Sequence, residues 1–271
     1  MKKFMVLALL TTAVTLSLPY KGECIERVVI LAPAAADVLA QLGADESVVG
    51  VTNSVMEFPH AAKVGTHLNP GIEKVASLQP TLIIANSRFN PELAKRMGAE
   101  CFVYEPRTLE GIIDAVRVLA QKIEKREAGE ELASTLEDIL NSLQRPENPP
   151  TVLYETRSTP VAIAKKQSII KNTLEQAGMM YAYPQSTGMI SAEYLLAHQP
   201  DFYIYQEGPM NKNPVSPLER VGWGGLRSCI WKVDEFDFAR ANTQLFTTVQ
   251  ELNTILNTDT PCETGKKRYP Q

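Results

Sequence analysis

The sequence lacks the motifs that mark nucleotide-binding loops and the commonest hydrolases. No GxGxxG or GxxxxGKS/T segment follows a predicted strand, and no GxSxG segment occurs. The three histidines, His60, His67 and His198, form no HxxxH pair. These absences give no support to phosphate-loop or hydrolytic metal chemistry. We therefore predict a binding protein that has no catalytic residues and no cofactor of its own.

Basic runs and low-complexity tracts are also absent, and only 7% of the residues are aromatic. The chain has 27 basic and 31 acidic residues, a formal net charge of −4. A mildly acidic chain without a basic patch is a poor nucleic-acid binder. In contrast, 44% of its 271 residues are hydrophobic, which suits one or two α/β domains with substantial cores.

Cysteine is scarce, and its spacing argues against a zinc module. The four cysteines are Cys24, Cys101, Cys229 and Cys262, with no CxxC pair and no neighbouring histidine cluster. Four cysteines allow three pairings, and an exported chain permits disulfides to form. We predict Cys24 with Cys101 and Cys229 with Cys262. Four free or partly buried thiols are the alternative.

The N-terminus has the pattern of a secretory signal. Lys2 and Lys3 precede an apolar run at residues 4–18, which is shorter than the roughly 20 residues needed to span a bilayer. We therefore assign residues 1–23 to a signal peptide and expect a periplasmic protein. Lipid attachment at Cys24 is an alternative, although Lys21 and Glu23 do not fit the small-residue pattern of such sites.

One unit of sequence occurs twice. Residues 63–86 and 188–208 each contain a loop, a short helical segment, Gln-Pro and an apolar strand with a polar end. Glu73 and Glu193 occupy the first turn of the two helical segments, where the helix dipole favours a carboxylate. The repetition predicts two similar lobes.

Buried apolar runs alternate with helical patterns, which favours an α/β fold with parallel sheets. We expect two small doubly wound lobes, residues 24–124 and 148–257. An amphipathic segment at 125–147 predicts a single long rigid helix that joins them, with an ordinary packed helix as the alternative. The polar tail, 258–271, is expected to be loose. The predicted strands are residues 27–31, 48–51, 82–85, 101–104, 151–154, 161–163, 201–205 and 229–233.

Polar side chains gather where these strands end, which is the edge at which open α/β sheets bind ligands. Arg88, Arg107 and Arg157 each lie within three residues of a strand end. Three guanidinium groups around one crevice would suit an anionic ligand, whereas solvated surface pairs are the alternative. The other candidate ligand-binding residues are Pro33, Asn53, Phe58, Thr66, His67, Phe89, Gln206, Trp223, Phe236 and Phe238.

The segments RVVILAPAAADVLAQLGADESVVGVTN, KVGTHLNPGIEKVASLQPTLIIA, SAEYLLAHQPDFYIY and GWGGLRSCIWKVDE occur in this order. Together they resemble the periplasmic substrate-binding proteins of ABC importers for cobalamin, ferric siderophores and haem, the helical-backbone class III family. Thr81 stands where the family usually has Asp. The resemblance implies a ligand cleft between the lobes, small closure on binding, and a membrane permease with its ATPase as partners. It also implies that Glu73 and Glu193 dock on permease arginines. We expect a monomer.

The ligand remains open at this point. A corrinoid would favour aromatic walls and few charges, whereas a ferric siderophore or haem would favour the arginines, so we rank an iron chelate first. Haem would also need an iron ligand. The candidates are His67, Met56 and His60 in the first lobe and Tyr181, Tyr183, Tyr203 and Tyr205 in the second. A receptor for a bare divalent metal and an enzyme on a related two-lobed scaffold are the alternatives.

Overall fold

The first lobe is built on a five-stranded parallel sheet with strand order β3-β2-β1-β4-β5. Its inner strands are apolar and buried on both faces, as expected when helices cover a parallel sheet. The chain order reverses between β1 and β4, which makes this lobe doubly wound. The strands are β1 (Val28–Ile30), β2 (Val48–Val51), β3 (Ala62–Lys63), β4 (Leu82–Ala85) and β5 (Glu100–Val103). The short edge strand β3 was not predicted.

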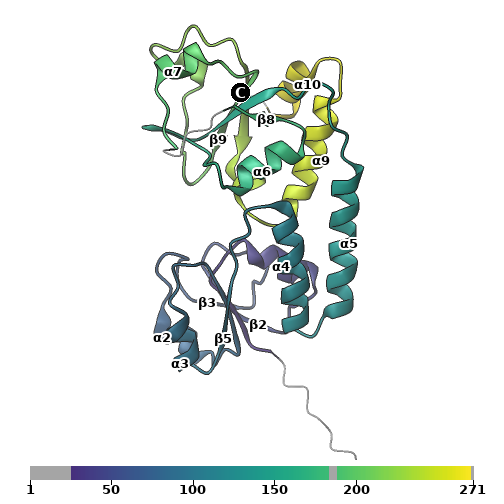
Figure 1. Cartoon of the computed structure of the whole chain (residues 1–271). Coiled ribbons are helices and arrows are strands. Elements are labelled where there is room, and N and C mark those ends of the chain that lie inside the picture. Colours follow the sequence, from purple (N-terminus) through teal and green to yellow (C-terminus); the bar gives the residue numbers. More distant parts are fainter. Residues whose placement is uncertain (1–25, 183–187, 270–271) are drawn as a thin grey trace, which may run out of the picture.

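The computed structural model describes residues 26–182 and 188–269 (Figure 1). The predicted signal peptide, Cys24 and Tyr183 therefore lie outside the described residues. Within them, no helix has the length and apolar character needed to cross a membrane. The helices of the first lobe are α1 (Ala35–Gln41), α2 (Ile72–Ser77), α3 (Pro91–Arg96) and α4 (Leu109–Lys122).

The second lobe has strand order β10-β9-β6-β7, with β8 also paired to β6. Three of these pairings are parallel, but β7 is antiparallel to β6, so this sheet is mixed rather than wholly parallel. The strands are β6 (Thr151–Ser158), β7 (Val161–Ile163), β8 (Met180–Tyr181), β9 (Phe202–Glu207) and β10 (Cys229–Asp234). The helical elements are α6 (Ile169–Gln176), α7 (Ala192–Ala197), η1 (Pro217–Glu219), α8 (Glu235–Ala239) and α9 (Gln244–Leu256).

The two lobes are joined by α5 (Arg126–Ser142), which lies within the predicted linking segment. Its 17 residues give a length of about 25 Å. It packs along α4 and reaches α9 (Figure 1). Gly129 allows the close approach to α4, since a Cβ there would lie 2.2 Å from the Cβ of Ala120. The largest apolar core contains residues of both lobes, so direct packing also holds the lobes together.

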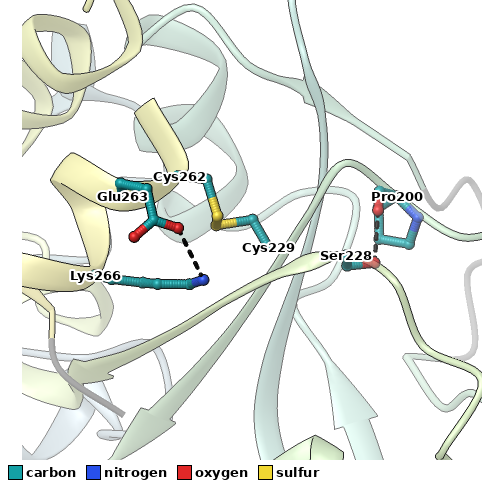
Figure 2. The surroundings of a disulfide bond; sticks show 6 residues. All are labelled: Pro200, Ser228, Cys229, Cys262, Glu263 and Lys266. Atoms are coloured by element: carbon teal, nitrogen blue, oxygen red, sulfur yellow. Dashed lines mark hydrogen bonds and ion pairs between the residues drawn. A yellow bond between two sulfur atoms is a disulfide. The ribbon is translucent and has the colours of Figure 1, made fainter. Parts of the chain in front are cut away.

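The described part of the C-terminal tail contains a packed helix, whereas the tail was expected to be loose. Helix α10 (Pro261–Arg268) packs on β10 and α9. The disulfide between Cys262 and Cys229 joins it to the sheet, as Figure 2 shows. Gly265 lies directly against the buried Trp231 ring, where a Cβ would be 2.0 Å from the nearest ring atom. The predicted pairing of Cys229 with Cys262 is thus present, whereas Cys101 has no disulfide partner among the described residues, and its predicted partner Cys24 lies outside them.

Candidate functional site

A cavity of about 970 Å³ lies between the two lobes. The first lobe contributes residues that follow β1, β2 and β5 and the loop before α2. The second lobe contributes the segment between β7 and α6 and residues that follow β9 and β10. The lining residues are Pro33, Ala34, Ser54, His67, Tyr104, Glu105, Pro106, Arg107, Lys165, Lys166, Gln167, Ile169, Pro209, Met210, Glu235, Phe236, Ala239, Arg240 and Ala241. The placement largely follows the rule that ligands bind beyond the carboxyl ends of strands.

Much of the cavity wall is apolar. Phe236, on α8, is 41% exposed, and Met210, in the turn after β9, is 65% exposed. The guanidinium carbon of Arg240 lies 3.8 Å from the centre of the Phe236 ring, so cation and ring form a stacked pair. Large side chains left this exposed at a cavity wall are available to bury a ligand.

Positive charge dominates the cavity. Four cationic side chains line it, Arg107, Lys165, Lys166 and Arg240, against two acidic ones. Among the described residues, none of the four has a carboxylate oxygen within 4.0 Å. The hydrogen bond of Arg107 that crosses between the lobes goes to a neutral group, the Oε1 atom of Gln167 at 3.5 Å.

The two acidic residues of the cavity are engaged by backbone amides. Glu235 is buried, and its Oε2 atom accepts a hydrogen bond from the Met210 N–H at 2.8 Å. This bond fixes the turn that carries Met210. Glu105 accepts a hydrogen bond from the Ser87 N–H at 3.1 Å. Neither carboxylate therefore neutralises the four cations by direct pairing.

Two sets of hydrogen bonds connect the lobes beside the cavity. The Tyr104 hydroxyl donates to the carbonyl of Ala241 at 2.6 Å. Burial, and then the nearby Asp37, raise the pKa of this hydroxyl, so it remains a donor. The Asp37 carboxylate accepts from the N–H and the hydroxyl of Thr243 at 2.9 and 2.6 Å. These hydrogen bonds between the lobes fix the spacing of the lobes at this side of the cavity.

Four of the predicted ligand-binding residues line the cavity: Pro33, His67, Arg107 and Phe236. Arg88 and Phe89 instead line a neighbouring pocket of about 260 Å³, which shares His67 with the main cavity. Asn53 and Thr66 support the loop that carries His67. The Asn53 N–H donates to the carbonyl of Gly65, and the Thr66 hydroxyl accepts from the Asn69 N–H at 3.1 Å.

The remaining predicted residues lie away from the cavity, and their placement corrects the expected site. Phe58, Phe238, Trp223 and Gln206 are buried in the lobes. Phe238 packs against Tyr154 because it lies two residues from Phe236 on one short helix and so faces the opposite side. Trp223, Gln206 and Arg157 contact residues of their own lobe: Tyr203, the Tyr154 hydroxyl and the Pro160 carbonyl respectively. Arg88, Arg107 and Arg157 therefore do not surround one crevice.

Among the candidate iron ligands that the structure describes, which leaves out Tyr183, His67 alone lines the cavity. His60 contacts the carbonyl of Asp45, and the Tyr181 hydroxyl donates to the carbonyl of Ala164. Tyr203 and Tyr205 are buried, and Met56 is exposed away from the cavity lining. Met210, Lys165, Lys166 and Arg240 were not predicted. Met210 follows β9 within three residues, so the strand-end rule would have identified it had apolar side chains been considered.

The described residues contain no group of three or more His, Cys, Asp or Glu side chains placed to hold a metal ion. Glu73 and Glu193 are exposed in the first turns of α2 and α7. Both helices lie on the side of the molecule away from α5 (Figure 1). The Glu193 backbone N–H, and then Ser191, lower the pKa of the Glu193 carboxyl.

Comparison with known proteins shows the family. The profile of the family described as "Periplasmic binding protein" matches residues 28–215. Vitamin B12-binding protein of Vibrio cholerae serotype O1 is 27% identical over 208 residues, covering 72% of this chain and 75% of that protein. The relative from Vibrio campbellii, also a vitamin B12-binding protein, is 23% identical over 202 residues, covering 69% of this chain and 73% of its own length.

Solved structures share the fold. The periplasmic heme binding protein HutB of Vibrio cholerae superposes with a TM-score of 0.75 at 19% identity, covering 86% of this chain and 99% of that one. S. aureus IsdE complexed with heme gives a TM-score of 0.69 at 20% identity, with coverages of 86% and 99%. The two-lobed α/β fold expected from the sequence is confirmed. The chain belongs to the family of periplasmic substrate-binding proteins of ABC importers, as its sequence motifs indicated.

Proposed function

We propose that this protein captures an anionic, largely apolar metal tetrapyrrole outside the cytoplasmic membrane and delivers it to an ABC permease driven by its ATPase. Haem is the first candidate ligand. The protein acts as an exported monomer without catalytic activity, and the cavity between the lobes is its ligand site.

The observation that carries this proposal is the set of four cations without acidic partners around an apolar cavity. The chain as a whole is acidic, so this local excess of positive charge is a feature of the cavity. Haem has a broad apolar ring and two carboxylates. The ring would be buried by Phe236 and Met210, while the carboxylates would form charge-assisted hydrogen bonds with cavity cations.

The iron of haem is commonly held by His or Met side chains. His67 reaches the cavity from the first lobe and Met210 from the second. These residue types would fit a haem iron. The names of HutB and IsdE, which describe heme binding, support the same choice.

A corrinoid is the second candidate, because the curated relatives in two Vibrio species are vitamin B12-binding proteins. The cavity wall argues against it, since its aromatic side chains are only Tyr104 and Phe236 and its charged groups are many. A ferric siderophore shares the need for cations but would make less use of the apolar wall. A bare divalent metal would need a ligand cluster, and none is present in the part of the chain that the structure describes.

Delivery to the permease is assigned to Glu73 and Glu193. Each is an exposed carboxylate in the first turn of the equivalent helix of its lobe. Support comes from their matching positions and from the family's use of one surface Glu per lobe. The alternative is that each carboxylate only stabilises its helix by interacting with the helix dipole. This alternative predicts that removing the two carboxylates has no effect on uptake.

A direct titration tests the ligand. Purified protein is mixed with haemin, cyanocobalamin and a ferric tris-catecholate in separate series, and visible absorbance and tryptophan fluorescence are recorded. We expect a shifted haem absorbance band and the tightest binding for haemin. Tighter binding of cyanocobalamin would replace haem by the corrinoid, and no response to any of the three would overturn the proposal.

The same titration tests the site. Arg107→Gln is expected to weaken haemin binding about tenfold or more, because a hydrogen bond to a charged group contributes about 1.5–3 kcal/mol. Arg157→Gln is the matched control: an exposed arginine outside the cavity, whose replacement should leave the dissociation constant within about twofold. Equal effects of the two variants would contradict the assigned cavity.

A further inference from the structure

We infer that the cavity holds its ligand in one orientation, with a flat face on the Phe236–Arg240 pair and the acidic edge toward Arg107, Lys165, Lys166 and Gln167. The orientation rests on the proposed function. It gives Arg240 a role in stacking and Arg107, Lys165 and Lys166 a role in binding the acidic edge, although residue type alone does not distinguish these cations.

The Phe236–Arg240 pair is a stacking platform. Phe236 retains 41% of its surface exposed although it lines a cavity, and Arg240 covers it at 3.8 Å from ring centre to guanidinium carbon. Both residues belong to one local segment, α8 and the residue after it, so their relative position is fixed by the backbone. A flat conjugated ligand gains from stacking against aromatic rings and guanidinium planes.

The remaining cavity cations form a separate polar group, at the junction between the lobes. Arg107 precedes α4 in the first lobe, while Lys165, Lys166 and Gln167 precede α6 in the second. The two helices are held together here, since the Leu109 N–H donates to Asn172 at 2.8 Å and Gln176 donates to Glu110 at 2.7 Å. The group therefore presents cations from both lobes, and hydrogen bonds between α4 and α6 hold the two lobes together at this place.

Arg107 is the member of this group best placed to bind an anion. Among the described residues, its hydrogen-bond partner is the neutral Gln167 amide oxygen at 3.5 Å, a long hydrogen bond that a carboxylate would replace with a stronger one. Lys165 and Lys166 are exposed, and the described residues offer neither an acidic partner. Arg240 differs because its guanidinium face already lies on a ring.

A comparison of haemin with its dimethyl ester separates stacking on the ring from binding of the carboxylates. The ester keeps the ring and the metal but has no free carboxylate. Arg107→Gln should weaken haemin binding about tenfold or more yet change ester binding by less than about twofold. Phe236→Leu and Arg240→Lys should weaken both ligands by the same factor, about threefold to tenfold each, because Lys keeps the charge and loses the planar face.

The outcomes are distinct. If wild-type protein binds neither haemin nor the ester, the proposed function fails. If it binds haemin and the ester but Arg107→Gln weakens both equally, or Arg240→Lys weakens neither, the orientation is wrong while the function stands. Arg107 and Phe236 are exposed, so the variants should fold, and unchanged circular dichroism and melting temperature confirm this before titration.

Discussion

The two copies of the loop–helix–strand unit build equivalent parts of the fold but contribute to the cavity through opposite ends. In the first lobe β4 lies between β1 and β5, and in the second β9 lies between β6 and β10. The first copy reaches the cavity through His67, in the loop before its helix. The second reaches it through the residues that directly follow its strand and polar end, Pro209 and Met210.

This difference shows that a repeated sequence unit can specify a fold without specifying a site. The polar end of the first copy, around Arg88, lines a separate pocket. The loop of the second copy, Gly188 to Ser191, lies outside the cavity lining. The two lobes therefore line the cavity with different surfaces, which would suit a ligand that has unlike faces. The carboxylates Glu73 and Glu193 remain the equivalent pair.

The largest expected effect tests that equivalence. Glu73→Ala combined with Glu193→Ala should reduce cellular uptake at least about tenfold while leaving the ligand dissociation constant unchanged, because both side chains are exposed and away from the cavity. Each single variant should have an intermediate effect if the lobes dock equally. Glu92→Ala, an exposed acidic residue in the first turn of α3, is the control. Loss of ligand binding in the double variant would instead make these residues part of the fold or cavity.

The next effect concerns a buried ion pair in the second lobe. Arg220 is 11% exposed and forms two hydrogen bonds, at 2.6 and 2.8 Å, with the fully buried carboxylate of Glu155. Arg220→Met leaves that carboxylate without its cation and should cost about 3–5 kcal/mol in urea unfolding. Arg157→Met, two residues beyond Glu155 on the same strand but exposed, should change stability by less than about 0.5 kcal/mol. Similar losses of unfolding free energy in both variants would show that the buried ion pair does not account for the effect of Arg220→Met.

The disulfide provides a third contrast between the lobes. The Cys229–Cys262 bond closes a segment with a sequence separation of 33, for which loop entropy predicts about 3–4 kcal/mol. The variant with Ser at both positions should lose about this much, and α10 should exchange its amide hydrogens faster. Cys101→Ser, in the first lobe, should be nearly neutral. Unchanged exchange in α10 would show that packing of Gly265 on Trp231 holds the helix without the bond.

The smallest effect concerns the starts of the two equivalent helices. Ser191 caps α7 by accepting from the Tyr194 N–H at 3.2 Å, whereas α2 begins at Gly71 without a side-chain cap. Ser191→Ala should destabilise the protein by about 1 kcal/mol, and Gly71→Ser should change stability by only a few tenths of a kcal/mol. Thermal unfolding of both variants checks the difference.

The cap also affects titration. The pKa of Glu193 is lowered in the folded protein, so its contribution to stability is present above its ordinary pKa of 4.5 and is lost as the pH falls through the lower folded value. Ser191→Ala should raise the pKa of Glu193 toward 4.5, as measured by NMR titration. No change in this pKa would show that the backbone N–H alone lowers it.

Much of the fold could be predicted because its signals are local. The predicted strands 48–51, 82–85 and 161–163 match β2, β4 and β7, since continuous apolar runs bounded by Gly, Pro and polar residues are typical of buried strands. The short edge strands β3 and β8 have two residues each and carry no such signal. The antiparallel direction of β7 could have been predicted, because only two residues separate the end of β6 from the start of β7 and so short a connection permits only antiparallel pairing.

The site was predicted less well, for a geometric reason. The rule that polar residues at strand ends meet at one edge identified Arg107, but it could not rank Arg107 against Arg88 and Arg157. Phe236 and Phe238 are the same residue type, yet their separation of two positions, about half a turn of a short helix, exposes the first and buries the second. Helix α10 was missed because its sequence is strongly polar, whereas its contacts, Gly265 on Trp231 and Cys262 with Cys229, join residues distant in sequence.

By itself, the sequence determined that this is a two-lobed α/β binding protein of the periplasmic family, because apolar periodicity and ordered motifs are properties of the linear chain. Tertiary structure alone decided which side chains share the cavity. The set of cavity residues depends on strand order, on side-chain direction and on the distance between the lobes. A shift of one or two residues moves a side chain from the cavity wall into the core. The four cations of the cavity come from three segments that are far apart in sequence, at positions 107, 165–166 and 240, and only folding makes them one site.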